Sequence, residues 1–358
     1  MTTSTKTFAG NYFEDFELDS VIKHGIPRTI TAGDISLYTG LTGSRFVLNC
    51  ADTVAKACGF EQMPVDNFLL FHIAFGKTVP EISLNAVANL GYAECQFLAP
   101  AYVGDTVAVE SRVIGLKENS NGKTGIVYVH SVATNQDGTT IVEWKRWVMV
   151  HKKVPSGVTG INSEPNLKSY LEPSAKLLPP TLDFSAFKPE WSACEYLWDD
   201  YEAGEAIDHV DGMTINDSDH SLATRLYQNN AKVHFDAHAM KSAHHGQRLV
   251  YGGHIISMCR ALSHNGLANG LWLAGINGGT HANPSFAGDT IYCKSQVVDK
   301  GEFEGRSDIG WVRVVTWGIK DVPGNELDAC FSIDNGRKRF DKNVVLELDY
   351  TLLMPRKQ

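Results

Sequence analysis

The sequence contains one long pattern twice, and this internal repeat limits the possible folds more than any other feature. The segment EDFELDSVIKH at residues 14–24 corresponds to DDYEAGEAIDH at residues 199–209, an offset of 185 residues (199 minus 14). The GDT tripeptides that begin at Gly104 and Gly288 follow at an offset of 184 (288 minus 104). A chain of 358 residues also exceeds the size at which a single hydrophobic core stops growing. We therefore predict two domains with the same architecture.

The segment between the two copies is rich in proline. Six of the 13 prolines lie within residues 151–191, and no hydrophobic period is sustained there. Because proline fixes φ and has no N–H donor, this composition is typical of an extended linker. We predict an N-terminal domain at residues 1–150, a linker at 151–195 and a C-terminal domain at 196–358.

Each copy places apolar helical segments before alternating strands. Residues 51–60 predict a short helix, and residues 67–79 and 253–268 predict longer helices that are apolar on most faces. Such a helix needs cover on most sides, so we expect an α+β fold in which an antiparallel sheet wraps around a central helix. Runs of period two rich in Val, Ile, Tyr and Trp predict strands at residues 106–116, 124–134, 140–150, 290–300, 310–319 and 344–353.

A sheet wrapped on a helix, present twice, resembles the double hotdog architecture of the MaoC-like enoyl-CoA hydratases. That family carries a stretch of the form G-D-x-N-P-x-H-x-D, in which an Asp and a His handle a water molecule. In the second copy, His234 matches the family His, Asp236 the trailing Asp and Asn229 the catalytic Asp position. The first copy has Ser44 and Asn49 at the two catalytic positions. Neither can act as a base near neutral pH, so the resemblance implies a substrate-binding first half and a catalytic second half.

Longer stretches are similar to the mesaconyl-CoA hydratases within this family. The resemblance implies a hydro-lyase that reversibly hydrates mesaconyl-C1-CoA to β-methylmalyl-CoA in a carbon-assimilation route. It also implies no metal and no cofactor, with CoA present only as part of the substrate. The stretches that carry it include GNYFEDF, HGIPRTITAGDISLYTGLTGSRF, FHIAFGKTVPEISLNAVANLGYAECQFLAP, LKENSNGKTGIVYV, DHVDGMT, ATRLYQNNAKVHFD and YGGHIIS.

Hydration of a conjugated thioester needs a base for water and a donor for the thioester oxygen. A histidine can take a proton and return it near neutral pH, so we expect His234 to be the base. The piece YGGHIIS places Gly252 and Gly253 before an apolar helix, where free N–H groups can hold an enolate oxygen. Asn229 cannot take a proton, but its amide can hold a water molecule. Whether Asp236, Asp219 or a neighbouring carboxylate replaces the missing family Asp, or His234 works alone with Asn229, stays open.

Mesaconyl-CoA has a free carboxylate on the carbon that receives water. A buried carboxylate needs a cation or several donors. The candidates near His234 in sequence are Arg225, Lys232 and His254, with Arg45 in the first copy. We expect Arg225 and His254 to form this site, with Arg225 first because Arg can hold a carboxylate through two parallel hydrogen bonds.

The residues alone leave three rival functions open. His234 and His238 lie four apart, a spacing that binds zinc on a helix and would suit a metal-dependent hydrolase. The piece VHFD nevertheless favours the end of a strand or a turn over a helix. A MaoC-type hydratase with another acyl substrate is the second rival, and a non-catalytic acyl-CoA binding protein is the third.

Composition excludes several classes of partner. A net charge of −9 argues against a nucleic-acid partner, because that binding depends on clustered Lys and Arg. No signal peptide, membrane span or nucleotide-binding fingerprint is present, so we expect a cytoplasmic enzyme without a membrane partner. Its expected partners are a CoA-thioester substrate and other copies of the chain in a homo-oligomer. The seven cysteines are scattered without a CxxC pair and predict reduced core thiols: Cys50, Cys58, Cys95, Cys194, Cys259, Cys293 and Cys330.

Overall fold

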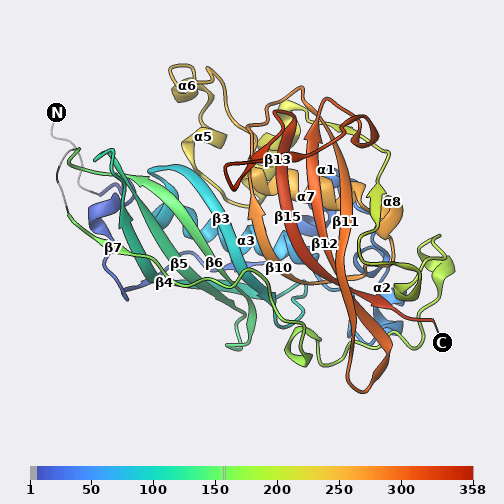
Figure 1. Ribbon diagram of the computed structural model, residues 1–358. Helices are drawn as coiled ribbons and strands as arrows, with labels where there is room; N and C mark the ends of the chain where they lie inside the picture. The colour runs from blue at the N-terminus through green and yellow to red at the C-terminus, as the bar shows by residue number, and fades with distance from the viewer. Residues whose placement is uncertain (1–5, 156, 158, 358) are drawn as a thin grey trace.

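The two halves of the chain share one antiparallel sheet (Figure 1). The computed structural model describes residues 6–155, 157 and 159–357. The sheet has 13 strands along the path β1-β4-β5-β6-β3-β10-β15-β12-β11-β8, with β2 and β7 beside β4 and β9 beside β11. A separate hairpin of β13 and β14 is inserted before the last strand.

The two halves contain equivalent elements in the same order. The first half contains β1 (Val21–Lys23), β2 (Arg28–Thr29), α1 (Ala32–Thr42), α2 (Asp52–Ala57), α3 (Asn67–Thr78), β3 (Ala86–Phe97), β4 (Thr106–Glu118), β5 (Thr124–Thr134) and β6 (Thr140–His151), followed by β7 (Asn162–Ser163). The second contains β8 (Ala206–Asp208), β9 (Met213–Thr214), α4 (Asp217–Leu226), α5 (Lys232–Phe235), α6 (Ala237–Met240), α7 (Gly252–Leu262), α8 (His264–Leu267), β10 (Trp272–Thr280), β11 (Thr290–Phe303), β12 (Arg306–Lys320), β13 (Phe331–Asp334), β14 (Arg337–Phe340) and β15 (Val344–Pro355).

The internal repeat also appears in buried hydrogen bonds. His24 Nε2 lies 2.8 Å from Ser111 Oγ in the first half. The equivalent His209 Nε2 lies 2.7 Å from Ser295 Oγ in the second. The offsets of these pairs, 185 (209 minus 24) and 184 (295 minus 111), are those found in the sequence. Both copies therefore adopt the same fold, and the predicted double hotdog architecture is confirmed.

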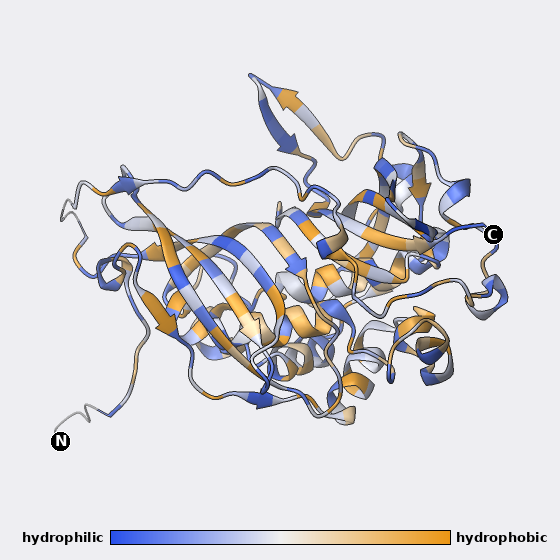
Figure 2. Ribbon diagram, turned by 90° about the horizontal axis from the view of Figure 1, so that it is seen from below, coloured by the Kyte–Doolittle hydropathy of each residue, from blue (hydrophilic) through white to orange (hydrophobic). Residues whose placement is uncertain are grey.

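The central helices α3 and α7 fill the concave side of the sheet. Every residue of α3 is buried, and α7 is buried from Gly253 to Leu262. Figure 2 shows apolar helices beneath strands whose colours alternate along their length, as a sheet with one face on the core requires. The helices meet through His72 Nε2, which lies 3.0 Å from Ser257 Oγ. The core is thus continuous between the halves.

Strands β3 and β10 form the seam between the halves. They pair antiparallel, with Cys95 opposite Ile276. The linker after β6 lies along the body of the molecule, where the backbone N–H of Leu171 donates to Asn277 Oδ1 at 2.8 Å. Its side chains Leu177, Leu182 and Phe184 are also buried, so this segment packs as part of the fold.

The cysteines only partly follow the sequence prediction. All seven are free, and five are buried. The prediction of core thiols is wrong for Cys50, which is exposed, and for Cys194, which is partly exposed. In the described part of the chain, no helix has both the length and the apolar character needed to cross a bilayer.

Candidate active site

A cavity of about 530 Å³ lies where the two halves meet. Its wall combines the start of β3 and the end of α3 with the segment before α7 and the loop after β10. Titratable groups in the described lining are Arg146, His151, Lys232, His234, His245 and His281, together with the phenols of Tyr92 and Tyr251, and no Asp or Glu is among them. The cavity therefore suits an anionic or neutral ligand that offers hydrogen-bond acceptors.

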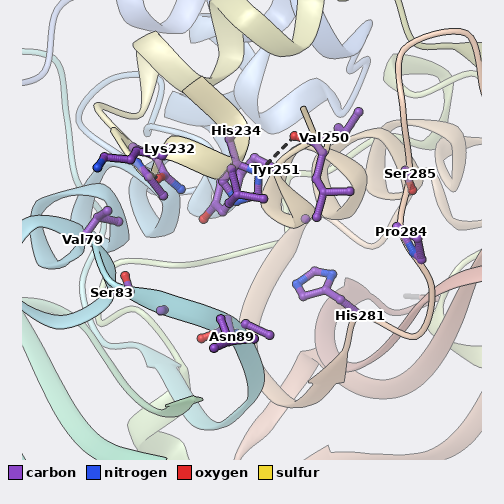
Figure 3. A pocket seen from close by; sticks show the side chains of 18 of the residues that line it. Val79, Ser83, Asn89, Lys232, His234, Val250, Tyr251, His281, Pro284 and Ser285 are labelled. Carbon is purple, nitrogen blue, oxygen red and sulfur yellow. Dashed lines mark hydrogen bonds between the residues drawn. The ribbon is translucent and has the colours of Figure 1, made fainter. Parts of the chain in front are cut away.

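His234 is held in one tautomer at the cavity wall (Figure 3). Its Nδ1 lies 3.0 Å from the carbonyl oxygen of Leu249, so Nδ1 carries the proton and Nε2 is left as an acceptor. Burial lowers the pKa of His234 to about 4, against the opposing effect of the Leu249 hydrogen bond. A neutral imidazole with a free Nε2 is a base that is ready at neutral pH.

The segment around His234 forms two short helices instead of a strand end. The expectation for VHFD was wrong, because α5 makes one helical turn there. Asp236 then ends α5 and caps α6, accepting a hydrogen bond from Ala239 N at 2.9 Å. His234 and His238 consequently lie on different helices. Within residues 6–155, 157 and 159–357, no three His, Cys, Asp or Glu side chains are grouped so that they could hold a metal ion.

Asn229 lines the same cavity as His234. It is 2% exposed, and its Oδ1 accepts a hydrogen bond from Ala231 N at 3.2 Å. Gln228 before it has φ of 53°, so the chain turns sharply into this position. The carboxylates considered as substitutes for the family Asp both lie outside the lining: Asp236 caps α6, and Asp219 belongs to the capping box of α4.

Gly252 presents the positive end of α7 to the cavity. It is the first residue of the helix, and its N–H has no acceptor among the described residues. A Cβ at this position would lie 2.3 Å from Cε1 of His281, so only glycine lets the imidazole pack on the backbone. Gly253 is not part of the lining and packs against the rings of Tyr251 and His72.

The two side chains expected to bind a carboxylate both lie outside the cavity lining. Arg225 is exposed at the end of α4. His254 is buried on α7, and burial lowers its pKa to about 4, so it is neutral at pH 7. The structure does not bring these two residues together with His234 and Gly252 in one lining.

Several cavity residues were not predicted from the sequence. Tyr251 has a buried hydroxyl without a hydrogen-bond partner, and Asn89 has a buried amide without one. Tyr92 hydroxyl lies 3.2 Å from His281 Nε2. Figure 3 shows Asn89 and His281 across the pocket from His234 and Tyr251. In the sequence, the position of Tyr251 directly before the two glycines could have indicated its place in the cavity. For His281, the indication was its position in the loop before the second GDT.

Arg146 on β6 is the most buried cation of the lining. Its side chain is 1% exposed, and Nη2 donates to Thr78 Oγ1 at 2.8 Å. The guanidinium carbon lies 4.1 Å from the ring centre of Phe75. Nε and Nη1 are buried without a hydrogen-bond partner.

The fold and the site together define a double hotdog protein of the MaoC type, with a histidine-bearing cavity at the seam. A double-hotdog-fold protein of Mycobacterium tuberculosis superposes with a TM-score of 0.71 at 18% identity over 97% of this chain and 99% of that one. A MaoC domain protein dehydratase structure from Chloroflexus aurantiacus, described as putative, superposes with a TM-score of 0.95 at 51% identity, covering 99% of this chain and 100% of that one.

The family is more specific than the fold. The family model for mesaconyl-CoA hydratase matches residues 2–323. The β-methylmalyl-CoA dehydratase of Chloroflexus aurantiacus is 51% identical over 99% of both chains. The mesaconyl-CoA hydratase of Cereibacter sphaeroides is 45% identical, over 98% of this chain and 100% of its own. The chain belongs to the mesaconyl-CoA hydratase family.

Proposed function

We propose that the protein is a hydro-lyase that reversibly converts mesaconyl-C1-CoA to β-methylmalyl-CoA. The observation that carries this proposal is the position of His234, whose unprotonated Nε2 shares a cavity with Asn229 and the free N–H of Gly252. These groups are a base, a water-holding amide and an oxyanion donor, the set that hydration of a conjugated thioester needs. The names and full-length coverage of the two curated relatives support the substrate.

The mechanism follows from these three groups. Asn229 holds the water molecule, and His234 Nε2 accepts one of its protons as oxygen bonds to the carbon that bears the free carboxylate. The electrons of the double bond move toward the thioester oxygen, which accepts a hydrogen bond from Gly252 N–H at the positive end of α7. The imidazolium of His234 then returns the proton to the α-carbon. One O–H bond and the π bond of the double bond are broken, and one C–O and one C–H bond are formed, so water is added without any net change in redox state.

The proposal includes no metal or redox cofactor, since the three groups supply every proton and charge that the reaction moves. CoA enters only as part of the substrate. A cytoplasmic location is part of the proposal and is supported by the seven free cysteines. The sequence-based expectation of a homo-oligomer is retained as a proposal.

Loss of enoyl-thioester absorbance tests the proposal. Purified protein is mixed with mesaconyl-C1-CoA or crotonyl-CoA, beside the variants His234→Gln and His130→Gln. His130 is half-buried on β5 outside the cavity and serves as the control. We expect rapid loss with mesaconyl-C1-CoA and a fall in kcat of about 10²- to 10⁴-fold in His234→Gln only. Loss with crotonyl-CoA alone would contradict the substrate, and no loss with either thioester would contradict the hydratase.

A further inference from the structure

The cavity contains a buried cation that has no anion. Arg146 forms no ion pair with any Asp or Glu of the described residues, and no carboxylate lines the cavity with it. Burial lowers its pKa only to about 10, so the guanidinium is protonated at neutral pH. Two of its three nitrogens lack a protein partner.

An unpaired buried charge is costly, and protein structures rarely keep one without a compensating group. The contact with Phe75 and the hydrogen bond to Thr78 compensate Arg146 only in part. A planar guanidinium binds a carboxylate through two parallel hydrogen bonds from Nη2 together with either Nε or Nη1. Nη2 of Arg146 donates one of its two hydrogens to Thr78, so its second hydrogen and those of Nε and Nη1 remain for a carboxylate. The missing anion is therefore best supplied by a ligand.

A chain of contacts joins Arg146 to the site of the thioester. Tyr92 is the cross-strand neighbour of Arg146 on β3, so the two side chains share one face of the sheet. Tyr92 hydroxyl contacts His281, and the ring of His281 packs on Gly252. Arg146 and Gly252 consequently line one cavity from different halves of the chain.

We propose that Arg146 binds the free carboxylate of the substrate and thereby selects dicarboxylic acyl-CoA thioesters over neutral ones. The proposal rests on the proposed hydratase function and assigns its substrate selectivity to one residue. The other candidate cations fit less well, since Arg225 is exposed outside the lining and Lys232 is exposed. In this proposal, Arg146 of the first half binds the substrate carboxylate, while His234 and Gly252 of the second half catalyse the hydration.

Matched pairs of thioesters test the proposal. Tiglyl-CoA has the shape of mesaconyl-C1-CoA with a methyl group in place of the carboxylate. Two saturated thioesters, one with that carboxylate (methylsuccinyl-CoA) and one without it (2-methylbutyryl-CoA), bind without reacting. Each is measured with wild type, Arg146→Met, Arg146→Lys, Arg225→Met and Lys232→Met, after circular dichroism has shown which variants are folded.

We expect Arg146→Met to lower the ratio of kcat/KM for mesaconyl-C1-CoA over tiglyl-CoA by about 10²- to 10³-fold. The Kd of methylsuccinyl-CoA rises by a similar factor, and that of 2-methylbutyryl-CoA changes much less. Arg146→Lys gives an intermediate ratio, because it keeps the charge and loses the planar fork. If Arg146→Met does not fold, the proposal is tested with Arg146→Lys alone. It then requires an intermediate kcat/KM ratio and a rise in the Kd of methylsuccinyl-CoA that exceeds any rise for 2-methylbutyryl-CoA.

Equal losses for both members of each pair would overturn the proposal, as would a larger change of the ratio in Arg225→Met or Lys232→Met. Failure of the proposed function gives a different result, because wild type then hydrates no mesaconyl-C1-CoA. In that case the two saturated thioesters still show whether Arg146 binds a carboxylate.

Discussion

The imidazole of His281 packs directly on the α-carbon of Gly252. A methyl group at Gly252 would lie 2.3 Å from Cε1 and 2.5 Å from Nδ1 of the ring, well inside van der Waals contact. The contact fixes the loop after β10 against the first turn of α7. Gly252 also lines the cavity, and its N–H has no hydrogen-bond acceptor among the described residues.

The substitution Gly252→Ala should therefore lower kcat by at least about 10-fold. The added methyl must displace His281 and turn the oxyanion donor, and loss of such a donor costs about 10² to 10³ in rate. Steady-state kinetics with mesaconyl-C1-CoA measures the effect. Gly33→Ala is the control, because Gly33 also lies in the first turn of a helix and a Cβ there meets Thr31 Oγ1 at an ordinary 3.5 Å. Equal kcat values for Gly252→Ala and Gly33→Ala would contradict the proposal that Gly252 N–H is the oxyanion donor.

The substitution Asn229→Asp should raise the pKa of His234. A carboxylate in the cavity favours the imidazolium, whereas the wild-type pKa is lowered to about 4 mainly by burial. The acidic limb of kcat/KM against pH should therefore move to higher pH. Asn229→Ala should lower kcat by about 10²-fold with no such move, since it removes the water-holding amide without adding charge. If the acidic limb of kcat/KM does not move in Asn229→Asp, the carboxylate does not act on His234, and the proposed pairing of the two residues is contradicted.

Stability should fall as the pH drops below about 6.5. Burial lowers the pKa of His72 to about 3 and those of His209, His254 and His281 to about 4. Between pH 6.5 and 4 the unfolded chain binds protons at these residues and the folded chain does not. The free energy of unfolding is therefore highest above pH 6.5 and decreases as pH falls toward 4. Urea unfolding at several pH values measures it, and a flat profile would contradict the buried neutral histidines.

The substitution Asn277→Ala should destabilise the protein by about 1–3 kcal/mol. The amide of Asn277 accepts from Leu171 N and donates to Asp349 Oδ1 at 2.8 Å, so its loss leaves a buried linker N–H unpaired beside the seam. Urea unfolding compares it with Asn162→Ala, an exposed residue of the same linker. Equal midpoints for the two variants would show that docking of the linker contributes little.

The strands flanked by turns could be predicted from the sequence, and the seam strands could not. Residues 106–116 and 290–300 alternate with period two, and β4 and β11 include them. Strand β10 is buried along its first six residues and rich in glycine, and β3 has three register shifts against β6. Neither strand presents a clean alternation, because Leu171 of the linker packs on β10 at Gly275 and the register shifts interrupt the period of β3.

The candidate site could be predicted where a local pattern existed. His234 and Asn229 lie at a fixed spacing, and Gly252 precedes an apolar helix, so each has a signal within a few residues. Arg146 has none, because an inward-facing arginine occupies the same period as any other strand residue. Arg146 becomes a candidate only because the three-dimensional structure gives its guanidinium no carboxylate partner among the described residues. The four-residue helix α5 was missed for a related reason, since one turn is too short to show a helical period.

The seam has a consequence for how the chain is made. The ribosome completes β3 long before β10, and at roughly 5–20 residues per second the remaining half takes on the order of 10–40 s to appear. During that interval the outer edge of β3 has unpaired N–H and C=O groups, a template for any other extended chain nearby. The newly made first half is therefore the stage of synthesis at which this protein is most exposed to aggregation and has most to gain from a chaperone.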